Sequence, residues 1–492
     1  MKPKIVLYNP RSNPTGKRIL PMSLLALAAV LEGRHEYTFV DGNISPEPLR
    51  LIRDQIRLGA NVVAVTVMPG PQLSQALPQC RILKEEYPEV KVVWGGYFPT
   101  IHASACLQSS AVDLVVRGHG EWVFLKLLDL LARNGDWRTL PGLAYRDDNG
   151  TAVENPSASP PHPEELPPYP YDRIDMAQYV RSTFLGSRTL PHHSSYGCPF
   201  LCSFCAVVNM ANGRWLAQSA ARVAAVAELY VARWQVNAIE FFDNNFFTQE
   251  ARVAEFAERI SPLGLNWWGE ARIDTLLRFS ENTWRSMRAS GLKAVYLGAE
   301  AATTRTLQSI DKGGTLTPEN TLEVAAKLKQ YGILPEFSFM VGCPPDPEAD
   351  ARATLEFIRR LKRVNPASEI IIYFFTPVPR PGRMYEAAVA DGFSFPDTLE
   401  EWVSSEWLEF VSRRHARGPW LREDLRRKIR NFERVLNAYY PTATDSRLTG
   451  FRRVLLRAAG AWRYHARVYG FPLELRVLQK LMHYQRPETT GF

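Results

Sequence analysis

Cysteine is scarce in this sequence of 492 residues, which holds only six, and three of these lie within one run of eight positions. So few cysteines exclude a disulfide framework, and the tight cluster favours a metal site in a reducing cytoplasm. No apolar run reaches the roughly 20 residues that span a bilayer. The opening MKPKIVLYNP lacks the sections of a signal peptide, and internal repeats and low-complexity tracts are missing. We therefore expect a globular, cytoplasmic protein of two or three domains.

Residues 1–150 alternate strand-like and helix-like segments. Apolar β-rich runs occur at KIVLYNP, YTFVD, NVVAVTVM, VKVVWGG and VDLVVRG, with helical patterns such as PMSLLALAAVLEGRH between them. This α/β alternation predicts a doubly wound, Rossmann-like parallel sheet with ligand loops at the carboxyl ends of its strands. Neither a GxGxxG fingerprint nor a Walker A loop is present, so nothing supports a dinucleotide or nucleoside triphosphate there.

Proline marks the first boundary. Seven prolines between Asn155 and Tyr171 disfavour regular structure and predict an extended linker, which we place at residues 151–185. A second strand–helix series then predicts a partial or full parallel β/α barrel over residues 186–392. The pattern becomes mainly helical and basic over residues 393–492.

The cysteine cluster consists of Cys198, Cys202 and Cys205, separated by three and then two residues. Such spacing lets one loop wrap three thiolates around a single metal centre, as iron–sulfur sites require. Three protein ligands leave one iron of a four-iron cubane free to bind another group. The alternative is structural zinc with His192 or His193 as fourth ligand, but zinc cysteines usually come as CxxC pairs.

The segment CPFLCSFC resembles the CxxxCxxC signature of the radical S-adenosylmethionine (SAM) superfamily, with Phe204 as the aromatic residue before the third cysteine. The resemblance implies a [4Fe–4S] cluster on these cysteines, whose open iron binds SAM. One electron, from a donor such as flavodoxin or ferredoxin, then cleaves SAM to a 5′-deoxyadenosyl radical. The resemblance assigns no role to Cys80, Cys106 and Cys343.

Strand-end motifs downstream of the cysteines resemble those that surround SAM in the same superfamily. Each motif alone is weak, because a carboxylate at a strand end can simply cap a helix, but their order and spacing match the barrel. The residues that the resemblance assigns to SAM are Phe204, Asp243, Asn244, Glu270, Arg272 and Glu300.

The amino-terminal region resembles the cobalamin-binding domain that precedes the barrel in one class of these enzymes, through the stretches 21–31, 66–68, 93–96 and 116–122. The residues assigned to cobalamin are Thr66, Gly95, Gly96, Gly118 and Glu121. An Asp-x-His-x-x-Gly loop is absent, so we expect no axial histidine from this domain and structural or solvated roles for its histidines. The alternative is a flavodoxin-like domain that binds no corinoid.

The pair of domains predicts a cobalamin-dependent radical SAM methyltransferase that acts on an unactivated carbon of a small molecule. Two other interpretations stay open. One keeps both cofactors but ends in cyclisation, rearrangement or hydroxylation, and the other is a non-catalytic iron–sulfur and cobalamin binding protein. The sequence names no substrate and no catalytic residue beyond the cofactor sites.

The net charge of +8 is concentrated in residues 401–492, which hold 18 Lys and Arg against 9 Asp and Glu. In the stretch 447–470, an apolar helical face of Phe451, Val454, Leu455 and Ala458 is flanked by arginines. Such a helix can pack against the barrel, with its arginines solvated, or lie on an anionic membrane surface. We do not expect nucleic acid as a partner.

Overall fold

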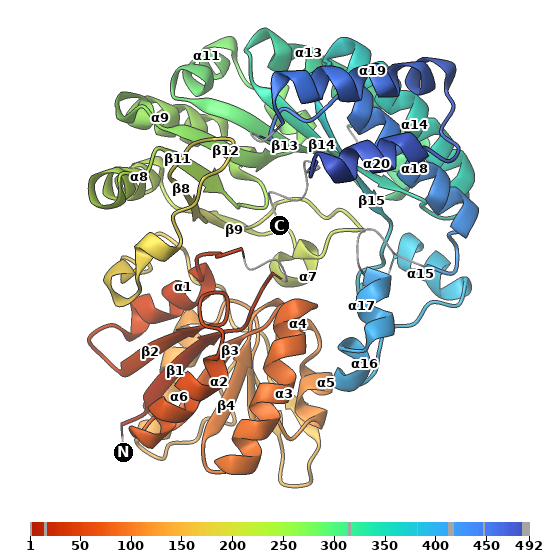
Figure 1. Cartoon of the computed structure of the whole chain (residues 1–492). Helices are drawn as coiled ribbons and strands as arrows, with labels where there is room; N and C mark the ends of the chain where they lie inside the picture. The colour runs from red at the N-terminus through yellow and green to blue at the C-terminus, as the bar shows by residue number, and fades with distance from the viewer. Residues whose placement is uncertain are drawn as a thin grey trace. The chain divides into compact units, whose positions relative to one another are not determined.

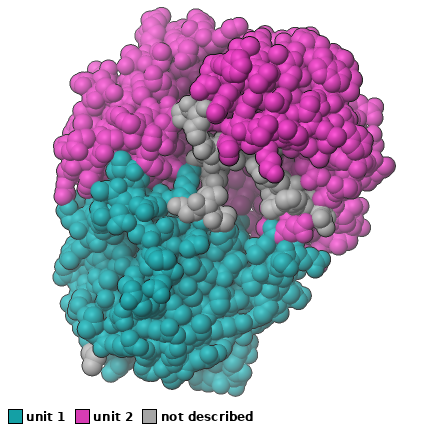
Figure 2. Space-filling model, viewed as in Figure 1, with its two compact units in different colours: residues 1–180, 216–218, 395–408 teal, residues 181–215, 219–394, 409–492 magenta. Residues whose placement is uncertain are grey.

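The computed structural model describes residues 2–13, 17–312, 316–380, 382–411, 418–445 and 448–484, and the chain divides into two compact units (Figures 1 and 2). Unit 1 comprises residues 1–180, 216–218 and 395–408. Unit 2 comprises residues 181–215, 219–394 and 409–492. Residues 395–408, from the region expected to form a separate helical domain, therefore belong to the amino-terminal unit.

Unit 1 is built on a seven-stranded sheet with the order β2-β1-β3-β4-β5-β6-β7. Its first five strands are parallel and are those expected from the apolar runs, which confirms the doubly wound fold. The strands are β1 (Lys4–Asn9), β2 (Glu36–Asp41), β3 (Val62–Thr66), β4 (Lys91–Gly95), β5 (Leu114–Val116), β6 (Leu143–Arg146) and β7 (Ala152–Glu154).

Helices cover both faces of this sheet, as Figure 1 shows. Leu24 and Leu25 of α1 are buried with Leu7, while Val6, Tyr8 and Trp94 join the core on the opposite face. The helices are α1 (Met22–Leu31), α2 (Pro48–Arg57), α3 (Pro71–Glu86), α4 (Tyr97–Ile101), α5 (Ala103–Gln108), α6 (Glu121–Ala132) and, after the barrel, α16 (Leu399–Trp402).

The hairpin of β6 and β7 was not predicted from the sequence. Both strands are short and antiparallel, and Tyr145 pairs with Val153. The connecting turn is stabilised by Asp147, whose carboxylate accepts hydrogen bonds from the backbone N–H groups of Asn149 and Thr151, at 2.9 and 2.8 Å. No helix or strand lies between Glu154 and Tyr171, as the proline content predicts.

Unit 2 contains a sheet of six parallel strands in chain order, β8-β11-β12-β13-β14-β15. Among the described residues β8 and β15 pair with no further strand, so the sheet is a partial β/α barrel. The strands are β8 (Thr189–His192), β11 (Ala238–Phe241), β12 (Asn266–Ala271), β13 (Leu292–Glu300), β14 (Leu334–Val341) and β15 (Glu369–Phe374).

Crossover helices line one side of this sheet in Figure 1. Phe241 and Trp267 point to that side, where Phe256 of α9 packs edge-on against both rings. The helices are α8 (Ala220–Trp234), α9 (Glu250–Ile260), α11 (Glu281–Ala289), α13 (Pro318–Gln330) and α14 (Pro347–Val364).

The other face of the sheet is unusually polar. Side chains alternate along a strand, so Glu240, Trp268, Glu270 and Glu336 share this face. Glu336 accepts a hydrogen bond of 2.5 Å from the indole N–H of Trp268, and Glu240 pairs with Arg181. Buried carboxylates therefore occupy the concave side of the sheet, where burial makes their charge costly.

The chain after the barrel is helical, as predicted. Three of these helices pack together in unit 2, and the first of them lies against α14 (Figure 1). The helices are α15 (Arg383–Ala390), α17 (Ser405–Val411), α18 (Glu423–Tyr439), α19 (Gly450–Ala466) and α20 (Leu473–Leu481). Among the described residues, no helix is both long enough and apolar enough to cross a bilayer.

Candidate functional site

Polar side chains gather at the carboxyl ends of the parallel strands in unit 2. Asp243 follows β11, Arg272 follows β12 and Glu300 ends β13. Because the carboxyl ends of parallel strands meet at one edge of a sheet, this is where ligands bind in such folds. The structure thus brings together three of the residues that the sequence assigned to SAM.

The cysteine loop follows β9 (Ser195–Gly197) and lies at the same edge. Its conformation is held by hydrogen bonds from the Cys205 N–H to the Cys202 carbonyl, at 3.1 Å, and from the Ser203 N–H to the Ile310 carbonyl, at 3.1 Å. Among the described residues, no three His, Cys, Asp or Glu side chains form a ready-made metal site. The three thiols nevertheless lie close enough for each of the outer two to interact electrostatically with Cys202.

Opposing influences act on the pKa of these thiols. Burial raises the pKa of Cys198, while the backbone N–H of Phe200 and the charges of Arg272 and Lys312 act in the opposite direction. Burial also raises the pKa of Cys205 to about 11, against a hydrogen bond from the backbone N–H of Val207. Backbone donors and two cations are the groups that stabilise thiolates and the sulfurs of an iron–sulfur cluster, so these residues fit such a cluster.

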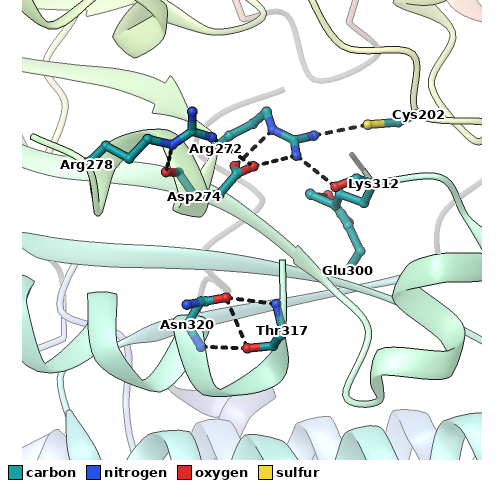
Figure 3. A network of polar contacts seen from close by, with 8 residues as sticks. All are labelled: Cys202, Arg272, Asp274, Arg278, Glu300, Lys312, Thr317 and Asn320. Carbon is teal, nitrogen blue, oxygen red and sulfur yellow. Dashed lines mark hydrogen bonds and ion pairs between the residues drawn. The ribbon is translucent and has the colours of Figure 1, made fainter. Parts of the chain in front are cut away.

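Arg272 contacts the cysteine loop directly (Figure 3). Its guanidinium is buried and donates to the Cys202 sulfur at 3.2 Å, and it lies 3.7 Å from the centre of the Phe200 ring. Two further nitrogens donate to both carboxylate oxygens of Asp274, each at 3.0 Å. This bidentate pair fixes the plane of the guanidinium and directs the remaining N–H toward sulfur.

A second buried ion pair lies next to the first (Figure 3). The ammonium of Lys312 is 2.6 Å from a carboxylate oxygen of Glu300, and its backbone carbonyl accepts a hydrogen bond of 2.8 Å from Arg272. Glu300 adopts a left-handed conformation, with φ of 61°, which turns the chain at the end of β13. Lys312 also lies 5.7 Å from the centre of the Phe204 ring. Phe204 and Glu300, which the sequence assigned to SAM from two separate motifs, thus both contact Lys312.

Asp243 is completely buried, and its hydrogen bonds go to the segment that leads into the cysteine loop. It accepts from the backbone N–H of Ser194 at 3.1 Å, from the Ser194 hydroxyl at 2.9 Å and from the Ser195 hydroxyl. Asp243 therefore positions the chain just before β9.

The two asparagines that follow Asp243 differ in their exposure to solvent. Asn244, the one singled out by the sequence, is exposed. Asn245 is fully buried, and neither its side-chain oxygen nor its side-chain nitrogen has a hydrogen-bond partner among the described residues. A buried amide without partners costs about 1–3 kcal/mol, so Asn245 has unused capacity to bind a polar ligand. Its sequence neighbours gave no signal that distinguished it from Asn244.

Glu270 carries the most perturbed carboxyl at this edge. Burial, with smaller contributions from the charges of Asp243 and Glu336, raises its pKa to about 8. It makes no hydrogen bond or ion pair with another described residue. A carboxyl of this kind is neutral at pH 7 and becomes ionised when a cation binds beside it.

A second candidate site lies at the strand ends of unit 1. Gly96 has φ of 97°, and a Cβ there would lie 3.2 Å from the Thr66 hydroxyl and 3.1 Å from the Val67 backbone. The Thr66 hydroxyl also lies 3.2 Å from that of Ser23 in α1. Gly95 and Gly96 thus let the end of β4 pack closely against Thr66 and Val67. We call this glycine-lined strand end beside Thr66 the cradle, because backbone without side chains lets a ligand approach closely.

The remaining predicted residues of unit 1 flank this cradle. The N–H of Gly118, where φ is 77°, donates to the Thr100 hydroxyl at 2.9 Å, and that hydroxyl donates to the Gly96 carbonyl at 2.7 Å. Glu121 is buried at the start of α6. Four of the five residues assigned to cobalamin therefore lie at or just after the ends of β3, β4 and β5, and Glu121 begins the helix that follows β5.

His35 and His102, in residues 1–150, make structural contacts. His35 pairs with Asp129 at 3.0 Å, and His102 packs between Phe98 and Trp402, where burial lowers its pKa to about 4. Burial also lowers the pKa of His119.

The other three cysteines are buried. Burial raises the pKa of Cys80 to about 12 and raises those of Cys106 and Cys343 as well. Cys80 accepts a hydrogen bond of 3.4 Å from the Trp94 indole. These thiols behave as packing residues.

Comparison with known protein families identifies two domains. Residues 14–128 match the B12 binding domain, and residues 193–358 match the radical SAM superfamily. The first match contains all five residues that the sequence assigned to cobalamin, and the second contains the cysteine loop and the strand-end residues of unit 2.

Characterised and uncharacterised relatives share most of the chain. An uncharacterized methyltransferase of Pyrococcus horikoshii is 28% identical over 79% of this chain and 83% of its own. The anaerobic magnesium-protoporphyrin IX monomethyl ester cyclase of Synechocystis is 26% identical over 67% of each chain. Among solved structures, the radical SAM methyltransferase TsrM of Kitasatospora setae, with cobalamin and a [4Fe–4S] cluster bound, superposes with a TM-score of 0.63 at 18% identity, covering 76% of this chain and 75% of its own.

The cysteine loop leads to a first prediction. Anaerobic reconstitution is expected to load about four irons per chain, the content of a cubane cluster. Replacing Cys198, Cys202 and Cys205 together by Ala is expected to abolish the iron and its visible absorbance. The single substitutions Cys80→Ala, Cys106→Ala and Cys343→Ala serve as controls. Equal iron loss in a control would mean that the ligand assignment is wrong.

Glu270 leads to a second prediction, on the ligand-free protein. The folded state keeps the Glu270 proton up to a pKa of about 8, whereas the unfolded chain loses it near the ordinary glutamate pKa of 4.5. Stability must therefore fall as pH rises between these values, because the folded state binds more protons. Glu270→Gln is expected to remove this loss and to gain on the order of a few kcal/mol over the wild type at pH 8, with little gain at pH 5.

Thermal unfolding of both proteins at several pH values measures this difference. Glu319→Gln, the same substitution at an exposed glutamate, provides the control. A constant offset between Glu270→Gln and wild type across the pH range would contradict the prediction.

Proposed function

We propose that this chain, which joins a B12 binding domain to a radical SAM domain and so belongs to the cobalamin-dependent radical SAM enzymes, methylates an unactivated carbon of a small molecule. The observation that carries the proposal is the combination in one chain of a cobalamin cradle and a cysteine loop backed by a buried arginine. An unactivated carbon has no lone pair with which to attack a methyl donor, so its methylation needs radical chemistry.

Three cofactors are assigned to the chain: a [4Fe–4S] cluster, SAM and cobalamin. Together they supply, when bound, a 5′-deoxyadenosyl radical and a transferable methyl group. In this proposal Cys198, Cys202 and Cys205 hold the cluster, and an electron donor such as flavodoxin or ferredoxin reduces it. The residues proposed for cobalamin are Thr66, Gly95, Gly96, Gly118 and Glu121.

The residues proposed for SAM have different roles in the protein's own architecture. Glu270 offers a carboxyl that ionises when a cationic group binds, and Asn245 offers an unused amide in place of the exposed Asn244. Asp243 acts indirectly, because its hydrogen bonds hold the chain before the cysteine loop. Glu300 holds Lys312, and Lys312 in turn lies over Phe204.

Arg272 has a different role from the one its strand-end position suggested. Its guanidinium is committed to Cys202, Asp274 and the carbonyl of Lys312, so we assign it to the cluster and not to SAM. Its permanent positive charge favours the reduced form of a cluster on the cysteine loop, since reduction adds negative charge there.

A second candidate function is a radical reaction without methyl transfer, such as ring closure. The similarity to a cyclase over 67% of this chain favours it. The two candidates share the cofactors and differ in what happens to the substrate radical.

Two coproducts distinguish these functions before the substrate is known. The reduced holoenzyme, incubated anaerobically with SAM, is expected to form both 5′-deoxyadenosine and S-adenosylhomocysteine, because methyl transfer consumes the methyl group of one SAM and radical formation consumes another. Liquid chromatography with mass spectrometry measures both. Deoxyadenosine alone would favour the non-methylating reaction, and neither product would favour the non-catalytic binding protein. The cysteine triple variant, which lacks the cluster, is the control for deoxyadenosine.

The assignment of Arg272 predicts a shift in cluster potential. Arg272→Met removes both the charge and the hydrogen bond to sulfur, so the midpoint potential is expected to fall by on the order of 50 mV, about a tenfold change for one electron. Arg272→Lys keeps the positive charge but lacks the planar guanidinium that pairs with Asp274 through two hydrogen bonds. It should therefore recover part of the shift in midpoint potential. Redox titration followed by electron paramagnetic resonance measures it.

Arg278→Met is the matched control, because Arg278 donates to the Asp274 carbonyl at 3.0 Å while its side chain is 69% exposed. It should leave the potential unchanged. An unchanged potential in Arg272→Met, with full iron content, would rule out this role.

A further inference from the structure

Large apolar side chains are exposed on one part of unit 2. In residues 451–481 nine of them are exposed, more than in all the rest of the described chain. Phe451 is 78% exposed, Phe471 72% and Leu481 70%. We call this set the apolar surface, and its members are Phe451, Val454, Leu455, Trp462, Val468, Phe471, Leu473, Val477 and Leu481. Exposed apolar side chains that are concentrated in one segment in this way point to an interaction site.

Packing against α18 explains why α19 turns its apolar face outward. Leu456, Gly460 and Tyr464 lie on the buried side of α19. A Cβ at Gly460 would lie 2.9 Å from the backbone nitrogen of Tyr439 in α18, so only glycine permits this close approach. Tyr464 stacks on the Tyr439 ring at 4.7 Å. The face of Phe451, which was expected either to pack against the barrel or to lie on a membrane surface, therefore remains in solvent.

The segment after α19 brings α20 alongside. Buried Arg463 donates to the Gly470 carbonyl at 2.8 Å and pairs with Glu474 at 3.0 Å, which ties the end of α19 to the start of α20. Leu473, Val477 and Leu481 are spaced by four residues and so share one exposed face of α20. Both helices thus contribute apolar side chains to the apolar surface.

Positive charge surrounds these side chains. Residues 448–484 contain seven Lys and Arg but a single acid, Glu474, which is already paired with Arg463. The side chains of Arg452, Arg476 and Lys480 are exposed and make no hydrogen bond or ion pair with another described residue. Arg457 is exposed as well, on the other flank of the α19 apolar face.

We propose that the apolar surface docks on an anionic phospholipid bilayer, with α19 and α20 lying in the interfacial plane. Apolar side chains at the centre and cations at the edge are the pattern of helices that bind a membrane interface, where long basic side chains reach the headgroups. A second copy of the chain does not complement this surface, because two such faces would bring like charges together. This inference is independent of the reaction that the enzyme catalyses.

Vesicle flotation of the cofactor-loaded, full-length protein tests the proposal. Phosphatidylcholine vesicles containing phosphatidylglycerol are expected to bind it at 0.1 M salt and to release most of it at 1 M, where the Debye length falls from about 10 Å to about 3 Å. Pure phosphatidylcholine should bind far less. Each of Arg452→Glu and Arg476→Glu is expected to weaken binding at least fivefold, which corresponds to ~1 kcal/mol per basic residue at an anionic surface.

The triple substitution Phe451→Ser, Trp462→Ser and Leu481→Ser is expected to weaken binding at least tenfold with no change in melting temperature or iron content. Leu58→Ser is the control, because Leu58 is 66% exposed on unit 1. Size-exclusion chromatography with light scattering tests the alternative, in which a second copy of the chain binds the apolar surface. Failure to float with anionic vesicles at low salt, equal losses in triple variant and control, or a dimer that the triple substitution dissociates would each overturn the proposal.

Discussion

The bidentate pair of Arg272 with Asp274 is the interaction on which the barrel site depends. Removing two charges from water is costly, and an arginine without its carboxylate would be an uncompensated buried charge. With Asp274 in place, the guanidinium can present an N–H to Cys202 while also holding the Lys312 carbonyl. Strand β12, the cysteine loop and the chain after β13 are thereby joined through one planar group, and the second ion pair of Lys312 with Glu300 extends the same network.

Much of the fold could be predicted because the strands of each sheet are apolar runs with recognisable helices between them. The runs that end at Asn9, Thr66 and Gly95 are buried on both faces of the sheet, so they are almost continuously apolar and are easily recognised as strands. The strands that were missed are of another kind. β6 and β7 are short and partly polar. β8 contains Pro191, and a proline argues against a central strand, but the structure accommodates it because β8 lies at the edge of the sheet.

The candidate site could be predicted only as a set of positions. Strand ends pointed to Asp243, Arg272 and Glu300, and the structure does bring these positions to one edge of the sheet. Their partners were out of reach, because Arg272 and Cys202 are 70 residues apart and only the fold makes them neighbours. Asn245 was missed for a similar reason. Only burial distinguishes it from Asn244, and two adjacent asparagines in a sequence do not show which of them is buried. The outward face of α19 likewise depends on Gly460 meeting α18.

The neutral carboxyl of Glu270 has a consequence for which ligands the barrel can distinguish. A cationic ligand that binds beside it draws the proton off and gains an ion pair, so its uptake at neutral pH is coupled to the release of a proton to solvent. A neutral analogue of the same shape gains no ion pair and displaces no proton. SAM carries a sulfonium and S-adenosylhomocysteine a neutral thioether, so these two molecules differ in the charge to which such a carboxyl responds.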